Sequence, residues 1–191
     1  NSVTHAGGVN VDAGAISLAA GTVTSVIRDS LITVNSNSVA GTSVALGGGI
    51  FVGNSVPLAI ESTTVSGNTT DGGGGAIYFR GASLSILDST LSANSVGVSG
   101  GAIVVGSGTG TVLLRNATLS GNSAAQNGGA LRSYTTSSTT TLIENSTITL
   151  NKATTNAGGI GRTSGTNIVM TLESTIVANN IHTSTRDFNF T

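Results

Sequence analysis

A short phrase recurs along the chain at a nearly constant interval. It consists of an aliphatic residue, two small or mixed residues and an asparagine, and its asparagines are Asn35, Asn68, Asn94, Asn122, Asn151 and Asn179. They follow one another at intervals of 33, 26, 28, 29 and 28 residues. Most copies are followed by a glycine pair and an apolar residue, as in Gly74-Gly75-Ala76-Ile77 and Gly100-Gly101-Ala102-Ile103. A fixed period of this size is typical of stacked, similar units, so it constrains the chain to a repeat architecture.

Polar and apolar residues alternate around each recurring aliphatic residue. In Thr64-Val65-Ser66 and Thr90-Leu91-Ser92 the apolar side chain lies between two polar ones, which is the pattern of a strand with one buried face. Further apolar runs lie upstream, at residues 58–60, 84–86, 112–114, 142–143 and 170–172, and after the glycine pairs, at residues 50–52, 77–79 and 103–105. Three short strands in about 28 residues predict one rung of a parallel β-helix.

These patterns predict an all-β fold, a right-handed single-stranded parallel β-helix (β-solenoid) of six or seven rungs with 26–30 residues each. Helices are disfavoured because β-branched residues dominate and glycines interrupt every rung, and the right hand follows from the crossover preference of parallel strands. One domain is expected over residues 1–191, with a degenerate first rung at 1–27, regular rungs at 28–179 and a C-terminal tail or cap at 180–191. Residues 36–47 are expected to form a longer loop, and Phe188 and Phe190 to cover the last rung.

The recurring asparagines are interpreted as a structural ladder. A turn asparagine tolerates left-handed backbone geometry, and stacked side-chain amides donate to the carbonyl oxygen of the next amide in the column. The predicted ladder is Asn35, Asn68, Asn94, Asn122, Asn151 and Asn179. The glycine pairs are expected to fill a second turn that requires positive φ or close backbone approach.

The polar residues beside the aliphatic column form a possible binding face. They are expected to point outward in two parallel rows made of Thr64, Ser66, Thr90, Ser92, Thr118, Ser120, Thr147 and Thr149. A regular threonine grid is similar to the ice-binding faces of some β-solenoids, although the second row is mostly serine and lacks the threonine methyl groups. Ordinary strand propensity on a solvated face explains the rows equally well.

Composition excludes several function classes. Only 8% of the residues are charged and the net charge is −1, so no basic surface is available to bind nucleic acid. The chain has no cysteine, which rules out disulfides and thiolate metal sites. No apolar run reaches the roughly 20 residues of a membrane helix, and no transmembrane segment is expected. No cofactor is expected either.

Enzymes of the β-helix class need clustered carboxylates with a basic residue beside them. The acidic residues of this chain are spread at about one per rung, and the sequence favours no catalytic residue and no metal site. Arg28 with Glu61 and Arg115 with Glu144 are interpreted as solvent-facing pairs. A weak cation or sugar site around Glu61, Asp88, Arg80 and Arg115 remains an alternative. His5 and His182 lie near opposite ends of the rod and are expected to be exposed.

The glycine-pair phrase together with the aliphatic-x-x-Asn phrase resembles the polymorphic outer membrane protein repeat over residues 28–179. It also resembles the wider class of β-helix repeats in large bacterial surface proteins. The wider class fits better, because the outer membrane subgroup usually has phenylalanine where this chain has Ile, Val or Leu. The resemblance implies a right-handed, extracellular fold linked to adhesion or surface display, and it brings no catalytic residues.

The function predicted from the sequence is a non-catalytic, extracellular bacterial β-helix for surface display, adhesion or filament assembly. Its expected partners are further copies of the chain, other cell-surface proteins or glycans, and no nucleic acid. A polysaccharide lyase or glycoside hydrolase and an ice-binding solenoid are the alternatives. Clustered carboxylates in a groove would favour the enzyme, and a flat threonine face would favour ice binding.

Overall fold

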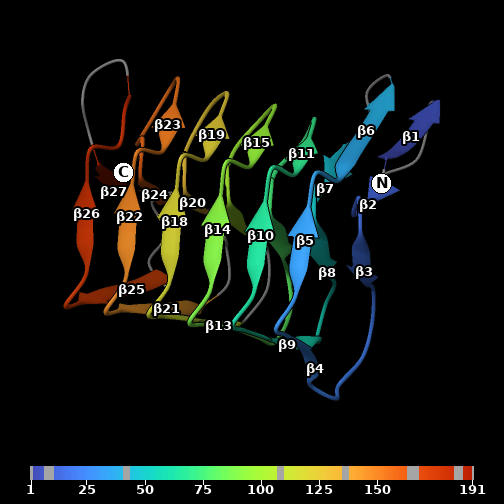
Figure 1. Cartoon of the computed structure of the whole chain (residues 1–191), viewed down its shortest axis with the longest axis horizontal. Coiled ribbons are helices and arrows are strands. Elements are labelled where there is room, and N and C mark those ends of the chain that lie inside the picture. Colours follow the sequence, from blue (N-terminus) through green and yellow to red (C-terminus); the bar gives the residue numbers. More distant parts are fainter. Residues whose placement is uncertain are drawn as a thin grey trace.

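The repeated apolar runs form short strands, and each strand stacks in parallel on its counterpart one repeat away (Figure 1). The computed structural model describes residues 2–6, 11–40, 44–106, 110–134, 138–162, 168–182 and 187–190, and within these ranges it has strands and turns and no helix. The all-β, parallel solenoid predicted from the sequence is confirmed, as are the strands predicted at the three apolar runs.

Two of the four main sheets are formed by the strands that come after the glycine pairs and by the strands that come next along the chain. The β12 sheet consists of β3 (Ile16–Leu18), β8 (Ile50–Val52), β12 (Ile77–Phe79), β16 (Ile103–Val105), β20 (Leu131–Ser133), β24 (Ile160–Arg162) and β27 (Phe188–Phe190). The β13 sheet consists of β4 (Ser25–Arg28), β9 (Pro57–Glu61), β13 (Ser83–Leu87), β17 (Thr111–Arg115), β21 (Thr139–Glu144) and β25 (Ile168–Glu173).

The other two main sheets are formed by the strands that come just before and just after the recurring asparagine in the sequence. The β14 sheet consists of β5 (Leu31–Thr33), β10 (Thr64–Ser66), β14 (Thr90–Ser92), β18 (Thr118–Ser120), β22 (Thr147–Thr149) and β26 (Ile176–Ala178). The β15 sheet consists of β1 (Ser2–Ala6), β6 (Ser36–Ala40), β11 (Thr69–Thr70), β15 (Ser95–Val96), β19 (Ser123–Ala124) and β23 (Lys152–Ala153). A small fifth sheet pairs β2 (Val11–Asp12) with β7 (Ala45–Leu46).

Three details differ from the sequence prediction. A rung has four strands instead of three, and the additional strand was missed because after Asn68, Asn94 and Asn122 it is only two residues long and shows no periodicity of its own. The predicted loop at 36–47 contains β6, which pairs with β1 and β11, and also β7. Over the described residues the solenoid makes about five turns, slightly fewer than the six or seven expected. The right-handed winding stays a prediction.

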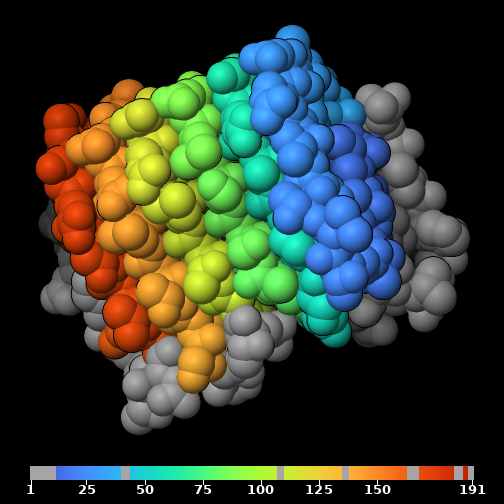
Figure 2. Space-filling model, turned by 90° about the horizontal axis from the view of Figure 1, so that it is seen from below, coloured from blue at the N-terminus to red at the C-terminus, as the bar shows by residue number. Residues whose placement is uncertain are grey.

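The core runs along the inside of the four sheets. Alternate residues point inward. Leu84 and Ile86 of β13 are almost fully buried while Ser85 between them is partly exposed, and Leu91 of β14 is buried while Ser92 after it is partly exposed. Each inward residue stacks on an equivalent residue of the next rung, and successive rungs contact one another as continuous bands (Figure 2). The apolar columns therefore supply the burial that a single rung cannot achieve alone.

The glycine pairs perform both tasks that the sequence predicted for them. The first glycine of three pairs has positive φ, with values of 73°, 69° and 64° at Gly74, Gly100 and Gly128, while in the next rung Ala157 has the positive φ, of 48°. At the second glycine, a Cβ atom would lie 2.0 Å from Gly129 O in the case of Gly101 and 2.2 Å from Gly158 O in the case of Gly129. These distances leave no room for a side chain between adjacent rungs.

A column of hydroxyl groups marks the corner before the β14 sheet. The hydroxyl of Ser89 accepts from the backbone N–H of Thr63 at 3.0 Å and donates to the carbonyl of Leu87 at 2.6 Å. The hydroxyl of Ser146 accepts in the same way from Ala117 N at 3.1 Å. Ser30, Thr63 and Thr175 also stand in this column. Ala117 interrupts it, since its side chain has no oxygen for the N–H of Ser89.

Replacing Ala117 with serine is therefore expected to raise the free energy of unfolding by about 0.5–1 kcal/mol, the net value of one buried hydrogen bond. A serine fits the space, since Ser89 and Ser146 occupy the neighbouring positions of the same column. Urea unfolding followed by circular dichroism measures the change. Ala102, which is fully buried in the apolar core, serves as the control, and Ala102→Ser should destabilise. A loss of stability in Ala117→Ser would contradict the role assigned to the column.

Candidate functional site

The asparagines form a continuous buried ladder along one corner of the rod. The backbone N–H and the side-chain amide of Asn94 both donate to Asn122 Oδ1, at 3.0 and 2.9 Å. Asn122 donates to Asn151 Oδ1 in the same way, at 2.9 Å for both bonds. Each amide also donates to a carbonyl of the preceding rung, as Asn122 does to Leu91 O at 3.0 Å. Asn35 and Asn68 continue the ladder towards the N-terminus.

The sequence prediction of Asn179 as the last member is wrong, and Asn180 occupies that place. Asn151 donates to Asn180 Oδ1 at 3.0 and 2.8 Å, while Asn179 is exposed in the turn beside it. The N–H and amide of Asn180 in turn donate to a carboxylate oxygen of Asp187, both at 2.9 Å. A carboxylate is suited to the end of the column because it only accepts hydrogen bonds.

The candidate binding face on the β14 sheet has the arrangement predicted from the sequence. Thr64, Thr90, Thr118 and Thr147 stack in one row, and Ser66, Ser92, Ser120 and Thr149 stack in a second row. All eight residues are partly exposed. The threonine row ends on apolar residues, because Leu31 pairs with Thr64 and Ile176 pairs with Thr147, whereas the second row continues to Thr33 and Ala178. The threonine grid is therefore four rungs long, and Thr175 belongs to the hydroxyl column and not to this row.

The charged residues of the β13 sheet pair along the rod. Arg28 Nε lies 2.7 Å from Glu61 Oε2, and Arg115 Nε lies 2.6 Å from Glu144 Oε2, which confirms the two solvent-facing pairs. The Glu61 hydrogen bond is the main cause that raises the pKa of Arg28. Asp88 accepts from the amide of Asn116 at 2.9 Å. Glu173 stands beside Glu144 in the register of the next strand.

The alternative cation or sugar site is not assembled by the fold. Arg80 follows β12 and donates to the Tyr78 hydroxyl at 3.1 Å, whereas Glu61 and Arg115 end strands of the β13 sheet. No group of three or more His, Asp or Glu residues with the geometry of a metal site exists among the described residues. His182 is buried, with an exposed fraction of 8%, so its predicted exposure is wrong. The side chain of His5 lies outside the described part of the chain.

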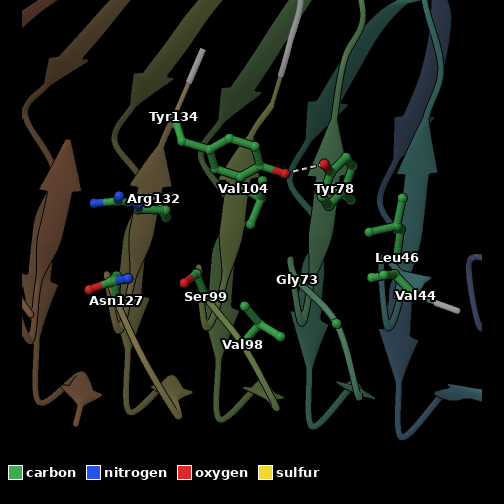
Figure 3. Close-up of a pocket in the computed structure, with 11 residues that line it drawn as sticks. Val44, Leu46, Gly73, Tyr78, Val98, Ser99, Val104, Asn127, Arg132 and Tyr134 are labelled. Atoms are coloured by element: carbon green, nitrogen blue, oxygen red, sulfur yellow. Dashed lines mark hydrogen bonds between the residues drawn. The ribbon is translucent and has the colours of Figure 1, made fainter. Parts of the chain in front are cut away.

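A pocket of about 220 Å³ lies on the outer face of the β12 sheet (Figure 3). Its floor is the row of middle residues of the strands, where Tyr78 and Val104 are buried outside the main core. Its wall is the segment that leads from the β15 sheet to the glycine pairs. The lining residues are Val44, Leu46, Gly72, Gly73, Tyr78, Val98, Ser99, Val104, Asn127, Arg132 and Tyr134. We call this the tyrosine pocket.

The two tyrosines of the pocket are tied together by their hydroxyl groups. Tyr134 lies two rungs from Tyr78, and Figure 3 shows its ring extending above Val104 to meet the Tyr78 hydroxyl. The Arg80 guanidinium lies 5.0 Å from the centre of the Tyr78 ring, and Phe51 stacks on the same ring with centroids 6.0 Å apart. Burial, followed by the hydrogen bond to Tyr78, raises the pKa of Tyr134. The phenol therefore stays neutral near pH 7.

The sequence indicated no pocket at this place. Tyr78 and Phe51 were visible in one type of strand, but Tyr134 and Arg132 belong to rungs further along the chain. They are identified by the register between β8, β12, β16 and β20. In this register Phe51, Tyr78, Val104 and Arg132 occupy one outward column. An outward column that carries aromatic and aliphatic residues instead of serine or threonine indicates a covered face.

Residues 62–80 match the family model of the Chlamydia polymorphic membrane protein repeat. The matched segment contains Asn68 of the ladder, the pair Gly74-Gly75 and the strands β10, β11 and β12. The chain thus carries a β-helix repeat of the polymorphic membrane protein type at these residues. No curated protein and no solved structure matches the chain. Among the described residues, no helix has the length and apolar character needed to cross a membrane.

Proposed function

We propose that the chain is a non-catalytic module of a bacterial surface protein, in which the solenoid is a rod for surface display and adhesion. The match of residues 62–80 to a polymorphic membrane protein repeat carries this proposal. The matched segment includes a ladder asparagine, a glycine pair and the outward Thr64. The same combination recurs in the following rungs, whose strands pair in register. The proposed location is the outer membrane or the cell surface, with the solenoid on the outside.

The distribution of charged residues supports a role without catalysis. Glu61 and Glu144 are each paired with an arginine at the solvent-facing edge of the β13 sheet. Glycoside hydrolysis needs two free carboxyl groups about 5–10 Å apart on either side of a sugar. The tyrosine pocket has no carboxylate among its lining residues.

The end strands support assembly with further copies of the chain. The outward row of the β14 sheet has threonine in its four central rungs and apolar residues at both ends, where Leu31 is 67% and Ile176 is 62% exposed. Val26 and Val169 are also exposed on the end strands of the β13 sheet. End strands offer unpaired backbone groups for strand addition. Sparse charge adds little repulsion between rods.

Surface labelling tests the proposed location. An antibody raised against the folded chain is expected to label intact cells of the source bacterium as strongly as permeabilised cells. Labelling that requires permeabilisation would contradict display on the surface. An antibody against a cytoplasmic protein serves as the control for cell integrity.

Sedimentation of Leu31→Lys and Ile176→Lys tests the assembly. The wild-type chain is expected to form dimers or longer species at micromolar concentration, and the double variant is expected to sediment as a monomer, because a charge at each end opposes apolar contact. Thr118→Lys places the same charge in the middle of the same row and should leave the assembly unchanged. A monomeric wild-type chain, or equal dissociation by Thr118→Lys, would contradict assembly through the ends.

A further inference from the structure

The tyrosine pocket is open because Gly73 carries no side chain. Gly73 belongs to the wall segment, at the position that directly precedes a glycine pair. The corresponding wall residues of the adjacent rungs are Leu46, Ser99 and Asn127. A Cβ atom at Gly73 would lie 3.1 Å from Val104 Cγ2 and 3.6 Å from Tyr78 Cε2, directly on the pocket floor. The missing side chain therefore leaves space above both floor residues.

The backbone requires glycine much less strictly at position 73 than at the neighbouring positions. In the run of four glycines at residues 72–75, Gly74 has φ of 73°, and a Cβ atom at Gly72 or Gly75 would collide with a carbonyl oxygen of an adjacent rung. Gly73 does not have positive φ, and the backbone atom nearest to its Cβ position is Ser99 O at 3.2 Å. The fold thus accounts for three of the four glycines, and Gly73 is accounted for by the space that it leaves in the pocket.

Aromatic and aliphatic groups enclose this space. Tyr78 and Val104 are buried in the floor, and Figure 3 shows the ring of Tyr134 above Val104. The tyrosine hydroxyls bond to each other and Arg80 donates to the Tyr78 hydroxyl, so both rings are held in place. The volume of about 220 Å³ exceeds that of an engineered apolar cavity of about 150 Å³ that binds benzene. A molecule with one or two aromatic rings therefore fits.

Two polar side chains lie at one edge of the space. Figure 3 shows Ser99 and Asn127 on neighbouring rungs, on the side away from Val44 and Leu46. Within the described part of the chain, neither the Ser99 hydroxyl nor the Asn127 side-chain amide hydrogen-bonds to another residue. Both groups can donate and accept. Because Ser99 is only 7% exposed, a ligand that bonds to its hydroxyl supplies a hydrogen bond that the fold does not.

Among the described residues that line the pocket, no charged group points into this space. The lining contains no carboxylate. The Arg132 side chain extends over Gly161, where its Nη1 lies 3.2 Å from the position of an added Cβ atom, and Figure 3 shows the guanidinium directed away from Val98 and Val104. A charged ligand would lose hydration here without gaining a counter-ion. The pocket is therefore suited to a neutral molecule.

We propose that the tyrosine pocket binds a small neutral aromatic molecule that carries a hydroxyl or N–H group, of the phenol or indole type. The ring lies over Gly73 and contacts Tyr78 and Val104 by offset or edge-to-face packing, and its polar group bonds to Ser99 and Asn127. This function goes beyond the proposed surface display. It is also separate from assembly, because the pocket lies on the β12 sheet and the apolar end residues lie on the β13 and β14 sheets.

Fluorescence titration of the whole chain with indole tests the proposal. The chain has no tryptophan, so emission excited at a wavelength that tyrosine does not absorb comes from indole alone. We expect this emission to shift to shorter wavelength and to saturate with a dissociation constant of about 1 mM or tighter. Phenol should displace indole about threefold or more better than toluene, the effect of one hydrogen bond, whereas a purely apolar pocket would prefer toluene, which is less hydrated. Benzoate should displace indole least.

Two sets of variants separate the polar edge from the enclosed space. The double variant Ser99→Ala and Asn127→Ala should bind toluene at least as well as phenol, because the polar edge is removed. Gly73→Ala places a Cβ atom on the floor and should weaken indole binding about fivefold or more. Gly121→Ala is the matched control, since it adds the same methyl group at a corner away from the pocket, and it should leave binding unchanged.

Val98→Phe fills the pocket from the rim, where Val98 is 37% exposed, and it replaces Gly73→Ala if that variant does not fold as judged by circular dichroism. Four results would each overturn the proposal. They are absence of saturable indole binding by the wild type, a wild-type preference for toluene or benzoate over phenol, a phenol preference that survives in the double variant, and full binding by the filled variant.

Discussion

Gly101→Ala is expected to lower the free energy of unfolding by about 3 kcal/mol or more, the upper range for overpacking a close contact. The added Cβ would lie 2.0 Å from Gly129 O, 2.8 Å from Ser123 N and 2.9 Å from Ser123 C. All three atoms belong to backbone, so no side chain can move aside. Relief requires adjacent rungs to separate at this corner, which weakens bonds such as Gly101 N to Gly128 O at 3.0 Å. Urea unfolding measures the loss.

Gly121→Ala is the control for Gly101→Ala. It shows how much stability is lost when a glycine is replaced at a position where a Cβ atom meets no neighbouring atom. Gly121 has φ of 64°, and its nearest atom to an added Cβ is Ala93 N at 4.0 Å. Ala93, Leu150 and Val34 occupy the same corner in other rungs with φ of 54°, 58° and 55°. We therefore expect Gly121→Ala to cost about 1 kcal/mol or less. Equal losses in both variants would show that backbone conformation and not clearance requires the glycine.

The fold was predictable because each rung repeats a short apolar pattern. Val65, Leu91, Leu119 and Ile148 recur at one distance from an asparagine, and all four stack in one buried column. The glycine pairs were equally informative, since a position that excludes any side chain can be occupied only by glycine. The two-residue strands such as β11 and β15 were missed, because two residues are too few to show an alternation.

The last rung shows the limit of pattern matching. Ile176 and Val177 both fit the aliphatic position, and Asn179 and Asn180 both fit the ladder, so two registers satisfy the same pattern. The structure selects the register in which Val177 pairs with Ile148 and the Thr175 hydroxyl accepts from Ser146 N. A one-residue shift reverses the face of every side chain in a strand, and only the contacts with the preceding rung decide between the two registers.

The tyrosine pocket was not predictable because its residues come from several rungs. Tyr78 and Tyr134 are 56 residues apart, and nothing in the residues around either tyrosine indicates that the two meet. Their contact depends on the wall segment between the β15 and β12 sheets, which covers the outward column of the β12 sheet. The sequence pattern describes which face of a strand is apolar but not which segment lies over it.

Asn122→Ala is expected to lower the free energy of unfolding by about 3 kcal/mol, because it removes the centre of the ladder. The backbone N–H and the amide of Asn94 lose their common acceptor, at 3.0 and 2.9 Å, and Leu91 O loses a donor at 3.0 Å. These groups are buried, and each unsatisfied buried group costs about 1–3 kcal/mol. Water cannot replace the amide without opening the rung.

Asn179→Gly is the matched control for Asn122→Ala, because Asn179 was the ladder residue predicted from the sequence and the structure places it outside the ladder. Its side chain is exposed and its φ is 58°, a conformation that glycine adopts freely, so the stability should change by about 0.5 kcal/mol or less. Asn180→Ala should instead cost more than Asn179→Gly, since Asn180 accepts two hydrogen bonds from Asn151. An Asn122→Ala variant as stable as the wild type would show that the column contributes no net hydrogen-bond energy. The rods would then be held together by the apolar columns and the strand pairing alone.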